Sequence, residues 1–128
     1  NRELVNLLGY PRRFERNLTQ SYTREIVSWI PQSTVGCITT LAILNCDEYI
    51  KSSGKRWNIL NNKHDSLLLE VPDEDVLEAA RFSVQAIKSI DLVGRHGVFN
   101  MKSEVKVGDN WGDYHEKYNP KGMMEYKL

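Results

Sequence analysis

His64 and Asp65 are the residues of this 128-residue chain whose types and setting best suit chemistry. They separate two runs of strand-forming residues, so the sequence predicts a tight hairpin with the His-Asp pair at its tip. A carboxylate at such a tip is exposed and is held by two strands. That arrangement suits Mg²⁺, which prefers oxygen ligands and keeps several of its own waters. Taken alone, however, a His-Asp pair is most often part of an ordinary turn.

The elements that must hold this pair are two strands and the helix that follows them. We predict strands over residues 56–62 and 67–71. Pro72 and the acidic residues 73–75 then open a helix that reaches about residue 90, because negative charge is favoured at a helix N-terminus. Strands and helices are segregated rather than alternating. This order predicts an α+β fold in which an antiparallel sheet is backed by helices.

A long helix is predicted upstream of the hairpin. A strand over residues 3–8 is followed by a turn and then by a helix over residues 21–50, with Thr19 or Ser21 as its N-cap. Pro31 lies within this helix and is expected to kink it or to split it in two, since proline removes one helical hydrogen bond.

The C-terminal third is predicted to be less regular. Gly94 and Gly97 bracket a loop that exposes His96, and a final strand is expected over residues 99–107. The residues from Gly108 onward are polar, and we expect them to lie irregularly on the surface.

The composition allows one modest core, with 41% hydrophobic residues. Residues 1–63 carry nine Lys and Arg against five Asp and Glu, whereas residues 64–128 carry eight against twelve. We find no stretch resembling a membrane span and no signal segment, so a soluble, cytoplasmic protein without membrane contact is expected. Cys37 and Cys46 lie in one predicted helix, too far apart to bridge, and are expected to be reduced thiols.

Four segments occur in an order that resembles the C-terminal end of family A, DNA polymerase I-like, DNA polymerases. These segments are residues 9–14 (GYPRRF), 30–35 (IPQSTV), 64–72 (HDSLLLEVP) and 107–111 (VGDNW). The resemblance implies that residues 1–128 are the C-terminal part of a polymerase palm domain, with a palm-type antiparallel sheet and a polar extension over residues 116–128. Departures from the family pattern favour a divergent, phage-type enzyme.

The resemblance also implies a reaction and its metal ligand. Asp65 would be the catalytic aspartate that binds two Mg²⁺ ions, shared with carboxylates outside this chain. His64 would contact the primer terminus. The reaction would be templated transfer of a deoxynucleotide from its triphosphate to the primer. Because the fingers, the thumb and the first palm segment are absent, the chain is expected to be inactive alone and to need the rest of the polymerase.

Contacts with primer–template DNA are implied for four further residues. Gln32 would lie in the minor groove, where the pattern of hydrogen-bonding groups barely depends on sequence. Arg24, two helical turns earlier, would reach the template strand. Arg12 and Arg13 would contact phosphate, although solvated loop arginines would look the same in the sequence.

Some residues depart from the family pattern. Ser66 stands where most relatives have Glu, Lys63 lies beside the predicted metal site, and Ser28 replaces the asparagine of the minor-groove contact. These departures leave two alternatives open. One is a non-catalytic nucleic-acid-binding or interaction module on the palm scaffold, and the other is an unrelated α+β domain.

Overall fold

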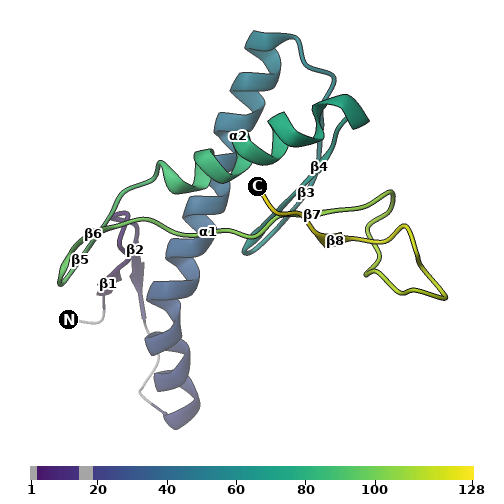
Figure 1. Cartoon of the computed structure of the whole chain (residues 1–128). Coiled ribbons are helices and arrows are strands. Elements are labelled where there is room, and N and C mark those ends of the chain that lie inside the picture. Colours follow the sequence, from purple (N-terminus) through teal and green to yellow (C-terminus); the bar gives the residue numbers. More distant parts are fainter. Residues whose placement is uncertain (1–2, 15–18) are drawn as a thin grey trace.

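The computed structural model describes residues 3–14 and 19–128. Its longest element is α1 (Gln20–Ser53), which runs the length of the molecule (Figure 1). Thr19 is the N-cap, as predicted, and its Oγ1 accepts a hydrogen bond from the Tyr22 amide at 3.1 Å. Gly54 ends the helix with a φ of 70°, a conformation that glycine adopts without strain. The predicted split at Pro31 is wrong, because α1 continues through that residue.

The N-terminal strands form a hairpin that docks on α1. Strand β1 (Glu3–Val5) pairs with β2 (Pro11–Arg13), and the buried Asn6 opens the turn between them. Its Oδ1 accepts two hydrogen bonds from turn amides, and its Nδ2 lies 3.3 Å from Ser33 Oγ and 3.5 Å from Cys37 Sγ. One side chain therefore shapes the turn and attaches it to the helix.

The predicted central hairpin and the helix after it are confirmed. Strand β3 (Asn58–Lys63) pairs with β4 (Ser66–Glu70), and both contact α1. The acidic segment forms a short 3-10 helix, η1 (Asp73–Asp75), which leads into α2 (Val76–Lys88). Helix α2 packs across α1 (Figure 1).

Aromatic side chains hold α1, α2 and the start of β3 together. Tyr49 of α1 stacks on Phe82 of α2 with a centroid distance of 4.2 Å, and its ring lies 5.5 Å from that of Trp57. Trp57 is only 3% exposed, and its Nε1 donates to an Asp75 carboxylate oxygen at 3.0 Å. Trp57 is therefore a packing residue at the junction of these three elements.

The predicted strand over residues 99–107 is wrong. Strand β5 (Leu92–Gly94) instead pairs with β6 (Gly97–Phe99), and His96 is exposed at their turn, as expected. Residues 100–105 form no strand, although every second residue is the more buried one. They keep the alternation of a strand, and the Val105 carbonyl accepts a hydrogen bond from the Tyr126 amide at 2.7 Å. Residues 100–104, however, pair with no strand in the described part of the chain.

The C-terminal residues fold back on themselves instead of lying irregularly on the surface. Strand β7 (Lys106–Val107) pairs with β8 (Met124–Glu125), so the expected extension over residues 116–128 completes a hairpin. The backbones of Gly108 and Gly122 lie so close that only glycine fits at position 108. A Cβ there would lie 2.6 Å from the Gly122 carbonyl carbon. The side chains of Asn110 and Asn119 exchange two hydrogen bonds of 2.9 and 3.0 Å across this hairpin.

The described residues therefore have an α+β architecture in which the strands form four separate antiparallel pairs. The pair β3–β4 has no third strand in the described part of the chain. A larger palm-type sheet thus stays a prediction.

Helix α1 is long and apolar enough to cross a membrane by length and composition, contrary to the expectation that no stretch would be. Within its most apolar stretch, 22% of the residues are buried. The same helix carries the β1–β2 turn, the β3–β4 hairpin and α2, so part of its apolar surface has a role in the fold.

Candidate functional site

His64 and Asp65 lie at the tip of the β3–β4 hairpin, as the sequence predicts. Lys63 pairs with Ser66, so the His-Asp pair forms a two-residue turn. Both side chains are exposed. Among the described residues, Asp65 makes no hydrogen bond or ion pair within the chain. Its carboxylate is therefore free to bind a ligand from outside.

Lys63, which precedes the His-Asp tip, contacts the C-terminal hairpin. Its Nζ lies 5.7 Å from the ring centroid of Trp111, which belongs to the C-terminal hairpin. This is within the range of a cation–π contact. Trp111 is 55% exposed. It holds the Lys63 cation against the C-terminal hairpin.

A groove of about 500 Å³ lies beside the tip, which we call the tip groove. Three elements build it: the turn between β1 and β2, one face of α1, and the end of the β3–β4 hairpin. Its lining residues are Tyr10, Ser33, Gly36, Cys37, Thr40, Leu41, Leu44, Asn62 and His64. Of these residues, His64 was predicted from the sequence to belong to a functional site. The sequence signal that could have identified the groove-lining residues of α1 is Gly36, a glycine within a predicted helix.

The residues predicted to contact DNA are exposed, but the structure does not bring them together into the tip groove. Gln32 precedes Gly36 by four residues, so it lies one helical turn from the groove on the same row of side chains. Arg24 lies two further turns away. Arg12 pairs with Glu25 at 2.8 Å, so part of its charge is already neutralised within the chain.

The described residues offer no group of three or more His, Cys, Asp or Glu side chains that could hold a metal ion. Asp65 thus offers one carboxylate at an exposed position. It fits a metal centre only if further carboxylates come from residues beyond those described here.

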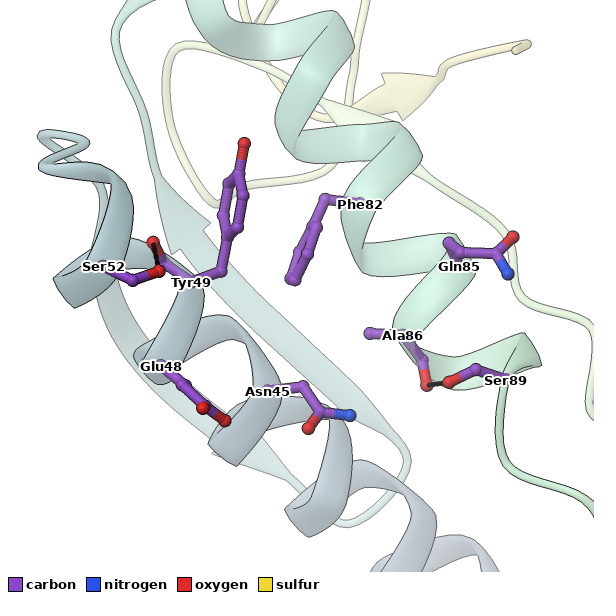
Figure 2. A pocket seen from close by; sticks show the side chains of 8 residues that line it. All are labelled: Asn45, Glu48, Tyr49, Ser52, Phe82, Gln85, Ala86 and Ser89. Carbon is purple, nitrogen blue, oxygen red and sulfur yellow. Dashed lines mark hydrogen bonds between the residues drawn. The ribbon is translucent and has the colours of Figure 1, made fainter.

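A second cavity, of about 390 Å³, lies between α1 and α2 (Figure 2). It is lined by Asn45, Glu48, Tyr49, Ser52, Phe82, Gln85, Ala86 and Ser89. The stacked rings of Tyr49 and Phe82 form one end of it. The lining has one carboxylate and no basic side chain, so it offers no arrangement typical of catalysis.

A polar contact beyond this cavity links the same two helices. Glu78 accepts hydrogen bonds from Lys55 Nζ at 2.7 Å and from Tyr49 Oη at 2.6 Å. The bond from Lys55, followed by that from Tyr49, lowers the pKa of Glu78 below its usual 4.5. The bond to Glu78 also raises the pKa of Lys55 above 10.5 and that of Tyr49 above 10.0.

We expect these shifts to give the fold a dependence on pH at both extremes. The depressed pKa of Glu78 contributes stability above pH 4.5, which is lost as the pH falls through the folded-state value. The raised pKa of Lys55 contributes stability below pH 10.5, which is lost as the pH rises through its folded-state value. Melting temperatures measured from acid to alkaline pH should vary less in Glu78→Gln than in the wild type. Glu116→Gln is the exposed control, and an unchanged profile in Glu78→Gln would contradict the assignment.

Two curated proteins are similar to this chain. A DNA polymerase of Bacillus phage SP01 is 27% identical over 97 residues, which cover 73% of this chain and 10% of the relative. The DNA polymerase I of Chloroflexus aurantiacus is 29% identical over 90 residues, covering 70% of this chain and 9% of the relative. The chain therefore spans about a tenth of the length of these relatives. No family model and no solved structure matches it. The similarity relates this chain to a segment of DNA polymerases.

Proposed function

We propose that this chain is part of a DNA-directed DNA polymerase of family A and contributes its His64-Asp65 tip to the active site. The observation that carries the proposal is the exposed Asp65 carboxylate, held by a two-stranded hairpin beside an open groove. The similarity to DNA polymerases supports this assignment over that of an ordinary turn.

In the proposed reaction, the 3′ oxygen of the primer loses its proton and attacks the α-phosphorus of a bound deoxynucleoside triphosphate. The new phosphodiester bond forms as the bond to pyrophosphate breaks. Two Mg²⁺ ions would stabilise the attacking and the leaving oxygen. Asp65 would supply one of their ligands, and carboxylates from the rest of the polymerase would supply the others. The position of His64 next to Asp65 suits contact with the primer terminus.

The DNA-binding residues would act around this tip. Gln32 would donate to acceptors in the minor groove, which every base pair offers. Arg24 and Arg13 are exposed and would reach the template strand and phosphate oxygens, respectively. We expect a smaller contribution from Arg12, since its ion pair with Glu25 must break before it can bind phosphate.

Ser66 is the residue that favours the alternative function, a nucleic-acid-binding module without metal chemistry. It follows Asp65 directly and lacks the carboxylate that most family members have at this position. Lys63 is the second residue that favours this alternative, because a cation near Asp65 would oppose metal binding. That argument is weaker in the structure, where Trp111 holds the Lys63 cation against the C-terminal hairpin.

We expect the 128-residue chain to extend no primer alone and to support Mg²⁺-dependent extension once combined with the remaining polypeptide of the same polymerase. The physical reason is that a single exposed carboxylate cannot hold two metal ions. Primer extension should be measured with each polypeptide alone and with both together, in Mg²⁺ or in EDTA. Extension by this chain alone would refute the division of the active site, and an inactive mixture that still binds DNA would favour the non-catalytic alternative.

A further inference from the structure

Helix α1 has an apolar surface that the described structure covers only in part. Residues 26–46 carry no charged side chain. A surface helix normally has charged residues on its outer side, whereas a helix that is apolar all round is buried in a larger protein or spans a membrane. Yet Val27 is 71% exposed and Leu44 is 58% exposed. This surface therefore calls for a further covering partner.

Gly36 is the position at which the backbone of α1 has no side chain to cover it. Glycine in the middle of a helix costs about 1 kcal/mol relative to alanine. Neither backbone conformation nor packing within this chain requires it, because its φ is not positive and an added Cβ would meet no atom within 4 Å. Gly36 is instead one of the residues that line the tip groove. The missing side chain keeps the helix backbone accessible from outside.

The lining of the tip groove indicates the chemistry of its occupant. It combines apolar side chains such as Leu41 and Leu44 with neutral polar ones such as Thr40 and Asn62, and it includes no Lys or Arg. Surfaces that hold a nucleic-acid backbone are strongly basic. A neutral, mixed lining is typical of contact with another polypeptide.

We propose that the tip groove is the docking surface for a polypeptide segment of the rest of the polymerase, which approaches α1 over Gly36. The inference rests on the proposed function. The relatives are about ten times longer than the matched region, so a polymerase has ample further polypeptide to fill the groove. His64 lines the groove and adjoins Asp65, so a segment docked there lies beside the tip, where further carboxylates are needed.

Gly36→Leu tests the proposal through assembly, with Asn45→Leu as the control. Asn45 is an exposed α1 residue that lines the other cavity, between α1 and α2. Leucine at position 36 should raise or preserve the melting temperature of the chain, since it favours the helix over glycine and its Cβ meets no atom within 4 Å. It should weaken binding to the remaining polymerase polypeptide about 10- to 100-fold, because it fills space that the partner occupies. Equal affinities for Gly36→Leu and the wild type in sedimentation or calorimetry would overturn the proposal.

The rate at which the Cys37 thiol is alkylated can be used to test which molecule fills the groove. Cys37 lines the groove and is half-buried, whereas Cys46 is buried, so alkylation should report on Cys37. We expect the remaining polymerase polypeptide to slow alkylation at least tenfold, an effect of ~1.4 kcal/mol. Protection by primer–template duplex alone, by phospholipid vesicles or by a high concentration of the chain itself would assign the groove to another occupant and overturn the proposal.

These measurements distinguish a failure of the docking proposal from a failure of the proposed function. Assembly and alkylation are both recorded without DNA synthesis. An assembly that protects Cys37 but extends no primer would count against the proposed function and would support the docking surface. A mixture that extends primers equally well with Gly36→Leu would count against the docking surface alone.

Discussion

Replacing Asp65 by Asn is expected to lower primer extension by the assembled polymerase about 10³-fold, which corresponds to roughly 4 kcal/mol of lost transition-state stabilisation. The amide keeps the size of the side chain but removes the negative charge that binds the metal ions. Because Asp65 is exposed and makes no hydrogen bond or ion pair among the described residues, the substitution should leave the fold intact. Single-turnover extension at saturating Mg²⁺ is the direct measurement.

Asp73→Asn serves as the matched control for this experiment. Asp73 is also exposed, but it lies at the start of η1, beyond the far end of strand β4. Asp73→Asn should change the rate of extension less than twofold. Both variants should bind primer–template DNA as the wild type does. Full activity in Asp65→Asn would exclude a metal ligand at the tip. Lost activity together with lost DNA binding would point to the nucleic-acid-binding alternative.

Truncation of Trp57 should have the largest effect on stability. Trp57→Ala is expected to lower the free energy of unfolding by about 3–5 kcal/mol, the usual cost of removing a buried aromatic side chain. The ring is 3% exposed, packs beside Tyr49, and donates its N–H to Asp75. A small domain has a total stability of about 5–15 kcal/mol, so the variant should be largely unfolded at modest urea concentration.

Trp111→Ala is the comparison for Trp57→Ala. Trp111 is 55% exposed, and its contact with Lys63 is worth about 0.5–1 kcal/mol at such a site. Urea unfolding followed by circular dichroism should therefore rank Trp57→Ala well below Trp111→Ala. If the two variants lose similar stability, the aromatic cluster between α1 and α2 is not the main support of the fold.

The sequence by itself determined the features that depend on neighbouring residues. Turn and strand propensities placed His64 and Asp65 between two strands, and the acidic residues after Pro72 correctly marked the start of a helical segment. Thr19 was one of two helix caps that the sequence offered, because capping needs only the residues of the next turn. The polymerase relation also came from the sequence, through short segments in a particular order.

The predictions failed where a contact between distant residues decides the outcome. Residues 100–104 have the alternation of a strand, but a strand needs a hydrogen-bonding neighbour. The sequence does not reveal that no strand in the described part of the chain pairs with them. The C-terminal residues were expected to be irregular because they are polar. The contacts of Gly108 with Gly122 and of Asn110 with Asn119 fold them into a hairpin instead.

Only the tertiary structure decided the composition of the tip groove and the direction of Lys63. The groove joins Tyr10, Gly36 and His64, which lie on three elements far apart in the chain. Lys63 contacts Trp111, a residue of another hairpin far along the chain. Propensity and periodicity describe how a residue relates to its sequence neighbours. Which distant surfaces meet depends on the packing of whole elements, and that packing assembles the groove beside the predicted metal ligand.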